Sequence, residues 1–106
     1  MKKIERIGEK KVMLDTDNDE MLYDSKRARA YQGGNSPTRG LDLYVHQCKD
    51  KSSVFYLFHW TQWQGERSFI EPLSKDRAAV FAEENLEDIE EGRVTELGFI
   101  DAEAIE

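Results

Sequence analysis

The sequence has little cysteine, little proline and no long apolar run, and each shortage excludes a class of protein. One cysteine, Cys48, stands among 106 residues, so no disulfide can form within the chain, which predicts a reducing, cytoplasmic location. No apolar stretch approaches the roughly 20 residues that a membrane span requires. The start at Met1 lacks the apolar segment of a secretory signal. We therefore expect a single cytoplasmic domain with no membrane partner.

Basic residues are scarce in the last quarter of the chain. Residues 1–82 hold 14 Lys and Arg against 12 Asp and Glu, whereas residues 83–106 hold 1 basic residue against 10 acids. The net charge of −7 therefore comes from the C-terminal quarter. Such a run is typical of a solvated acidic helix with a frayed end; the alternative is a tail that mimics nucleic acid or docks on a basic partner. We predict one domain over residues 1–86 and an acidic extension over 87–106, partly docked or frayed.

Aromatic residues are abundant in one segment, residues 54–70, which holds six of the eleven Phe, Tyr and Trp. Aromatic and β-branched residues in such density predict a buried strand. Both faces of its alternation are apolar, which predicts a central strand covered on both sides. Gln64 and Gly65 then indicate a hairpin corner, with residues 66–71 returning and Phe69 and Ile70 continuing the apolar pattern. Together with the alternating residues 41–48, the pattern predicts a three-stranded antiparallel meander.

Shorter elements precede the meander. Residues 2–6 and 10–14 alternate around Gly8 and predict a hairpin, and residues 21–23 predict a short strand. A short helix is expected over residues 26–32, because Asp24 or Ser25 can cap its first turn.

The last strand and the main helix follow the meander. Pro72 is expected to end the strand, because it has no N–H for a ladder. Ser74 is expected to cap a helix that lays Ala78, Phe81 and Ala82 across the sheet. The predicted fold class is α+β: a mostly antiparallel sheet of four to five strands with one main C-terminal helix packed across it, and a short helix after the second or third strand.

Two motifs frame the aromatic hairpin. Leu22-Tyr23-Asp24-Ser25-Lys26-Arg27-Ala28 precedes it, and Ile70-Glu71-Pro72-Leu73-Ser74 follows it, ahead of a helix that carries alanines. On these motifs the chain resembles a group of small uncharacterised microbial proteins that are often found in mobile or host-variable gene sets. The resemblance covers about residues 21–86. It implies a fold, and it implies neither an activity nor a catalytic residue.

Three side chains offer the elements of a metal or thiol site. His46 and Cys48 lie two apart on one predicted strand face, and His59 joins them if the strand register is suitable. A catalytic zinc site or a Cys–His nucleophile needs such a cluster. The spacing is no metal-binding signature, however, and nothing local activates the thiol. Ordinary half-buried strand residues are the favoured interpretation, and we expect no metal, no cofactor and no catalysis.

Two loops resemble ligand-binding motifs and depart from them. Asp15, Asp17 and Asp19 match the opening of a calcium-binding loop, but Glu20 stands where a glycine is needed and Lys26 where a bidentate glutamate is needed. A solvated turn is therefore predicted there. Residues 33–40 are rich in glycine but lack Gly-Lys-Ser/Thr and precede a strand, which excludes a phosphate-binding loop.

The most interesting pair of residues is Trp60 and Trp63, near the end of the predicted hairpin. Exposed aromatics beside Arg67 and Arg39 anchor protein partners or stack on bases, whereas the alternative places both tryptophans in the core. The sequence favours a non-enzymatic protein–protein interaction or regulatory module that uses these four residues. The alternative function is nucleic-acid binding by the same aromatics, joined by three basic residues of the short helix: Lys26, Arg27 and Arg29.

Overall fold

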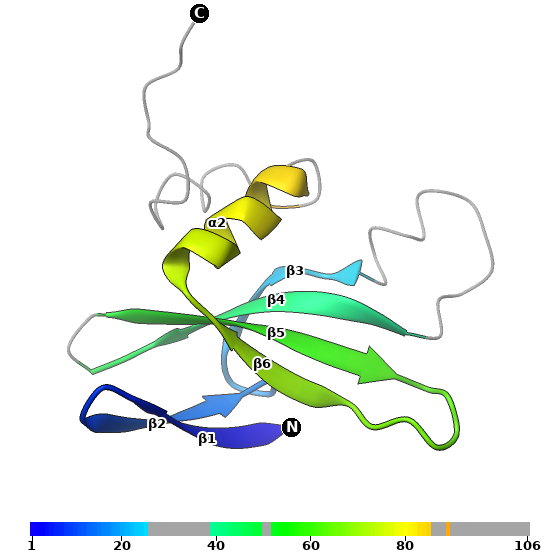
Figure 1. Ribbon diagram of the computed structural model, residues 1–106, viewed down its shortest axis with the longest axis horizontal. Helices are drawn as coiled ribbons and strands as arrows, with labels where there is room; N and C mark the ends of the chain where they lie inside the picture. The colour runs from blue at the N-terminus through cyan, green and yellow to red at the C-terminus, as the bar shows by residue number, and fades with distance from the viewer. Residues whose placement is uncertain (26–38, 50–51, 86–88, 90–106) are drawn as a thin grey trace, which may run out of the picture.

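The computed structural model describes residues 1–25, 39–49, 52–85 and 89. These residues form three layers (Figure 1). A four-stranded antiparallel sheet of order β3-β4-β5-β6 lies in the middle, with a helix on one face and a separate two-stranded hairpin, β1-β2, on the other. The elements are β1 (Lys2–Ile7), β2 (Lys10–Asp15), β3 (Glu20–Tyr23), β4 (Arg39–Gln47), β5 (Ser53–Thr61), β6 (Phe69–Leu73) and α2 (Lys75–Glu84).

The predicted α+β class, with an antiparallel sheet and one helix across it, is confirmed for the described residues. Six strands divide between two sheets, instead of joining one sheet of four to five strands. Several predictions fall outside the described residues: the short helix over 26–32, nearly all of the glycine-rich loop, and nearly all of the acidic extension. Ile89, which is described, is buried against the cluster under α2.

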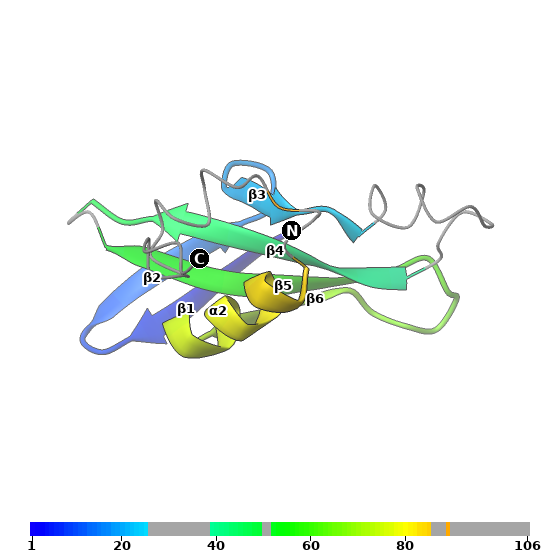
Figure 2. The same ribbon diagram turned by 90° about the horizontal axis from the view of Figure 1, so that it is seen from above.

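The N-terminal hairpin forms where the alternation predicts it. Gly8 has φ +63, a left-handed conformation that glycine adopts without strain, and it turns the chain from β1 into β2. Val12 and Leu14 point inward and pack against Tyr44 and Tyr56 of the main sheet. Viewed from above, the hairpin crosses beneath the longer strands (Figure 2). Burial of this alternating face is what holds the hairpin to the sheet.

The meander β4-β5-β6 is confirmed, and its central strand is covered on both faces. On one side of β5, Phe55 and Leu57 join the cluster that lies under α2. On the other side, Val54 and Tyr56 face the N-terminal hairpin. In the register of β4 with β5, Tyr44 stands opposite Tyr56, and their rings stack at a centroid distance of 5.3 Å. Two apolar faces on one strand thus correspond to two covering layers.

Pro72 lies inside β6, so the prediction that it ends the strand is wrong. Among the described residues β6 is an edge strand, paired with β5 alone, and Pro72 stands opposite Tyr56. The Ile70 carbonyl, two residues earlier, accepts a 3.3 Å hydrogen bond from Lys3 Nζ, so it points away from β5. Backbone groups two residues apart in a strand point to the same side, so those of Pro72 also point away from β5. The N–H that proline lacks would face outward, and no ladder bond is lost. The strand also begins later than predicted, at Phe69.

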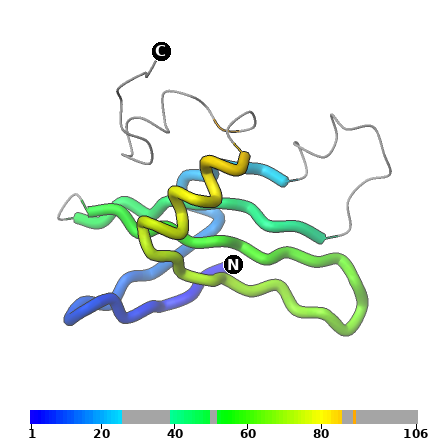
Figure 3. Tube along the Cα trace, turned by 45° about the horizontal axis from the view of Figure 1, so that its top comes forward, coloured from blue at the N-terminus to red at the C-terminus, as the bar shows by residue number. Residues whose placement is uncertain are grey.

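Helix α2 begins as predicted. The Ser74 side chain accepts a 3.2 Å hydrogen bond from the Arg77 N–H, and Asp76 lies in the first turn, where its charge suits the helix dipole. Ala78 and Ala82 are fully buried, and their small side chains let the helix lie close to β5. Figure 3 shows α2 following directly from β6, while the β5–β6 loop lies at the opposite end of that strand. The helix therefore leaves the loop end of its sheet face uncovered.

Candidate functional site

Trp60 lies in the interior, with 6% of its surface exposed. Its indole Nε1–H donates to Ser25 Oγ at 2.9 Å and to Asp42 Oδ1 at 3.2 Å. The Asp42 carboxylate also accepts from the Ser25 N–H at 2.9 Å and from its hydroxyl at 2.7 Å. Trp60 was expected to contact a partner at the surface, but it contacts Ser25 and Asp42 in the interior instead. Its polar tip is fully satisfied inside the fold, as buried tryptophans require.

Trp63 lies in the β5–β6 loop, with 53% of its surface exposed. The loop around it is held by two backbone interactions: the Glu66 N–H donates to the Trp63 carbonyl at 3.2 Å, and the Trp63 N–H donates to Thr61 Oγ1 at 3.1 Å. Gly65, at φ +90, supplies the left-handed residue in this turn, so the predicted hairpin corner is confirmed. The tryptophan is exposed, and its backbone is fixed.

The Trp63 ring is also held from the side. The Arg39 guanidinium lies 5.4 Å from the ring centroid, a cation–π distance. Glu66 fixes that guanidinium, because its Oε2 lies 3.3 Å from Arg39 Nη1 while its Oε1 accepts from the Thr61 hydroxyl at 2.8 Å. One carboxylate therefore ties strand β4, strand β5 and the loop together beneath an exposed aromatic ring.

Phe69 repeats this arrangement one strand away. It was expected to continue the buried pattern, but 51% of its surface is exposed, because it stands on the helix-bearing face beyond the reach of α2. Its ring stacks on His59 with centroids 4.1 Å apart, and His59 Nε2 lies 2.7 Å from Glu71 Oε1. Glu71 Oε2 lies 3.7 Å from Arg77 on α2. Sequence patterning gave no signal for this second exposed aromatic.

We call Arg39, His59, Trp63 and Phe69 the aromatic strip. Arg39 stands opposite Thr61, Leu41 opposite His59, and His59 opposite Phe69, so alternation places all of them on one face of the sheet. Trp63 joins them from the loop through its contact with Arg39. The strip thus holds two exposed aromatic rings, each resting on a basic side chain that a carboxylate fixes.

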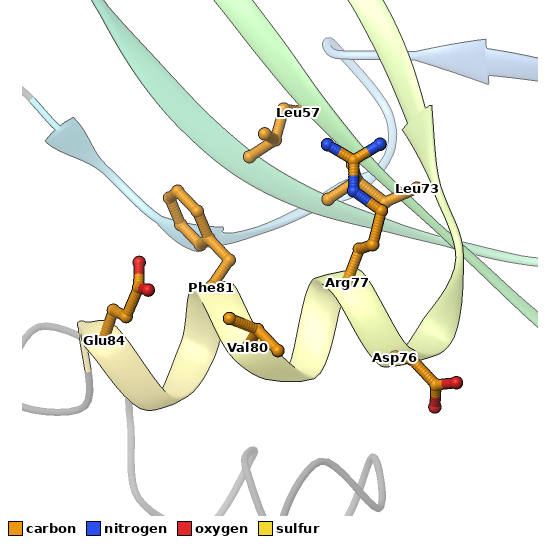
Figure 4. Close-up of a pocket in the computed structure, with 7 residues that line it drawn as sticks. All are labelled: Leu57, Leu73, Asp76, Arg77, Val80, Phe81 and Glu84. Atoms are coloured by element: carbon orange, nitrogen blue, oxygen red, sulfur yellow. The ribbon is translucent and has the colours of Figure 1, made fainter.

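A groove of about 340 Å³ continues this face toward the helix (Figure 4). Leu57, which stands two residues before His59 on the same strand face, lies in its floor with Leu73. Phe81 and Arg77 point from α2 toward these leucines, whereas Asp76 points away (Figure 4). The remaining lining residues are Val80 and Glu84. Arg77 lines the groove, and its ion-pair partner Glu71 contacts His59 of the aromatic strip. The groove and the strip are therefore adjacent parts of a single surface.

The other basic residues predicted to bind a partner do not lie against an exposed ring in the part of the chain that the structure describes. Arg67 is exposed in the β5–β6 loop beyond Trp63. Lys26, Arg27 and Arg29, the basic residues of the nucleic-acid alternative, lie outside the described residues. Arg39 is therefore the predicted basic residue that the structure brings to an exposed ring.

His46, Cys48 and His59, which the sequence offered as a possible cluster, do not come together. His59 lies on the helix-bearing face, whereas His46 lies on the opposite face with Tyr44 and Tyr56. Cys48 packs partly buried against the cluster that contains those tyrosines. No group of three His, Cys, Asp or Glu side chains suited to a metal ion occurs in the part of the chain that the structure describes.

His46 instead belongs to a polar cluster that the sequence did not reveal, centred on the Asp19 carboxylate. Asp19 Oδ1 lies 2.7 Å from His46 Nδ1, and Oδ2 accepts from the Tyr56 hydroxyl at 2.7 Å and the Asp15 N–H at 2.8 Å. Burial, followed by the bond to Asp19, raises the pKa of Tyr56, and burial raises the pKa of Tyr44 to about 12. The cluster joins the turn after β2 to β4 and β5.

The turn after β2 satisfies its aspartates internally. Asp15 Oδ1 accepts from the Asp17 N–H at 3.0 Å, and Oδ2 accepts from the Asn18 amide at 2.5 Å. These bonds, led by the one from Asp17, hold the pKa of Asp15 below its ordinary value of 3.8. A turn forms where it was predicted, but it is only partly solvated: Asp15 and Asp19 are turned inward, and Asp17 is exposed. Asp15 and Asp19 organise the backbone here.

Comparisons with family models, with curated proteins and with solved structures found no match to this chain. The resemblance to small uncharacterised microbial proteins consequently stays a prediction. No helix among the described residues is both long enough and apolar enough to cross a membrane.

Proposed function

We propose that this chain is a non-enzymatic protein–protein interaction module whose contact surface is the aromatic strip together with the groove beside α2. The occupant is a segment of a partner protein that presents an apolar side chain and a carboxylate. The apolar side chain covers the rings of Trp63 and Phe69, and the carboxylate meets Arg67 or Arg77 at the margin of the surface.

The fixed, exposed ring of Trp63 carries this proposal. About half of the side chain is open to solvent, although the loop beneath it is tied by Glu66, Thr61 and Arg39. Exposing a large aromatic ring leaves its burial energy unused, and fixing it removes much of the entropy that binding would otherwise cost. Tryptophan and arginine are also the residues that dominate the energetics of protein interfaces.

The same surface is less suited to nucleic acid. Glu66 and Glu71 already lie within ion-pair distance of Arg39, His59 and Arg77, and Asp76 and Glu84 line the groove. Phosphate groups on such a surface would meet as many acids as bases, whereas nucleic-acid affinity comes mainly from phosphates neutralised by free Lys and Arg. The stacked aromatics alone favour the alternative, and it is retained as an outcome of the test.

The test is affinity capture from source-cell lysate, with and without nuclease and quantified by mass spectrometry, for three forms of the chain. W63A/F69A removes both exposed rings. The matched control, M21A, truncates an exposed apolar side chain on β3. We expect a protein captured by the wild type and by M21A to fall at least about tenfold with W63A/F69A, the order expected for interface anchors. All forms should remain folded at the capture temperature, because about half of each ring is already exposed, and thermal unfolding checks this.

Two results would overturn the proposal. Equal capture by the wild type and W63A/F69A would show that the aromatic strip is not the contact surface. Capture that disappears with nuclease, and whose strength falls steeply between low and physiological salt, would replace the protein partner with nucleic acid.

A further inference from the structure

The outer face of the β1-β2 hairpin carries an apolar pair flanked by bases. Val12 and Leu14 point toward the sheet, so the alternate side chains point away from it. Ile4 and Met13 stand opposite each other there, with 62% and 51% of their surfaces exposed. This outer face lies on the far side of the sheet from α2 (Figure 1).

Basic side chains surround this apolar pair. On the rung next to it, Arg6 stands opposite Lys11, and both are exposed. Lys2 lies on the other side of Ile4, where it stands opposite Asp15 and helps to lower the pKa of that carboxyl. Among the described residues, Arg6 and Lys11 have no ion-pair partner. The nearest acid in sequence, Glu5, points the other way along the alternation and lies 3.6 Å from Lys3. Like charges directly opposite on neighbouring strands destabilise a hairpin, and an anion held between them would remove that repulsion.

We propose that this outer face is a second binding surface, and that it binds a short acidic segment of a partner protein in which a large aliphatic side chain neighbours a carboxylate. The aliphatic side chain rests on Ile4 and Met13, while a neighbouring carboxylate meets Arg6 and Lys11. Six-residue strands make the face roughly 20 Å long, so a single extended segment of about six residues is long enough to cover it.

The distribution of charge over the molecule favours a short acidic segment over an extended anionic surface as the ligand of this face. A charge is felt across roughly 8 Å at physiological ionic strength, so a segment on the hairpin senses mainly Arg6 and Lys11, because Asp15 stands opposite Lys2. A membrane or a nucleic acid faces more of the molecule at once, and residues 1–82 hold 14 bases against 12 acids, so the larger surface offers little net attraction. Juxtamembrane basic clusters also commonly hold four to eight Lys and Arg, compared with three on this face.

The experiment measures fluorescence anisotropy of a labelled peptide that has a central leucine flanked by glutamates, with the full chain as titrant. R6E/K11E reverses the basic rung. K49E/K75E makes the same change in net charge at exposed lysines elsewhere and is the matched control. I4S/M13S removes the apolar pair, whereas M13L retains it. Thermal unfolding of every variant establishes that the hairpin remains folded.

We expect binding on the order of 100 µM at low salt, as suits a small exposed interface, and weaker binding as salt rises. R6E/K11E should weaken it at least about tenfold and K49E/K75E less than about twofold, because the nearby charges dominate. I4S/M13S should also weaken it, and M13L should not. Equal weakening by both charge-reversal variants would overturn the proposal. So would unchanged binding of a peptide whose leucine is replaced by glutamine, or binding to phosphatidylserine vesicles without binding to the peptide.

Discussion

Replacing Tyr56 by phenylalanine tests the polar cluster around Asp19. The substitution keeps the ring, which is fully buried and stacked on Tyr44, and removes the hydroxyl that lies 2.7 Å from Asp19 Oδ2. A hydrogen bond to a charged group contributes about 1.5–3 kcal/mol. Asp19 keeps its contacts with His46 and the Asp15 N–H, so the loss should lie in the lower half of that range.

Tyr44→Phe is the matched control. Tyr44 is the other ring of the stacked pair, and its hydroxyl makes no hydrogen bond with the described residues. Its removal should therefore change the free energy of unfolding by less than about 1 kcal/mol. Urea unfolding at pH 7, followed by tryptophan fluorescence, measures both changes.

Alkaline pH gives a second, independent signature. The folded chain keeps the Tyr56 proton after the unfolded chain has lost it near pH 10, because the folded pKa is raised. The folded state then binds more protons, so the free energy of unfolding falls as pH rises, by about 1.4 kcal/mol per pH unit for each such tyrosine. Tyr44, with a folded pKa of about 12, adds a similar slope between pH 10 and 12. Tyr56→Phe removes one of the two slopes.

The stability difference between the wild type and Tyr56→Phe should consequently shrink between pH 10 and pH 11. Other groups that titrate in that range act on both proteins and cancel in the difference. Parallel stability curves would refute the burial and bonding assigned to Tyr56. A larger loss for Tyr44→Phe than for Tyr56→Phe at pH 7 would do the same.

Two further substitutions test the buried network and the turn. Gly40→Ala places a Cβ against Ser25 Oγ and 2.9 Å from Trp60 Cζ2. This crowding should cost about 1–3 kcal/mol of stability and shift the Trp60 emission to the red. An unchanged denaturation midpoint would contradict the packing described. Asp15→Asn should lower the melting temperature at neutral pH by an amount that narrows as pH falls below 3.8. The lowered pKa of Asp15 contributes stability above 3.8 that is lost as pH falls through the folded value, so a constant gap down to pH 2 would contradict it.

The local elements of this fold could be read from the sequence because each has a local cause. Gly8 and Gly65 mark turns that need a left-handed residue, Ser74 supplies a helix cap, and the two apolar faces of residues 54–60 require two covering layers. Each signal depends on residues near one another in the chain.

The predictions that were wrong depended on placement in space. Pro72 is tolerated because β6 is an edge strand, and edge position is set by the whole sheet. Phe69 is exposed because α2 does not reach it. The alternating pattern of the strand could not reveal this, because it places Phe69 on the same face as buried residues. Trp60 and Trp63 are three residues apart and differ in environment because the strand ends between them, at Thr61. Asp19 joined His46 and Tyr56 only through the way the hairpin crosses the sheet.

The order of the strands has a consequence for how fast this chain folds. In the four-stranded sheet every hydrogen-bonded neighbour is also the next strand in sequence, and the hairpin pairs with itself. Each pairing therefore closes one connecting segment, and no strand must wait for a distant one to arrive. Chains dominated by such local contacts cross their folding barrier faster than β proteins whose neighbouring strands are remote in sequence. The connection between β3 and β4, residues 24–38, is the longest in this sheet, and its closure is expected to be the slowest of the pairing steps.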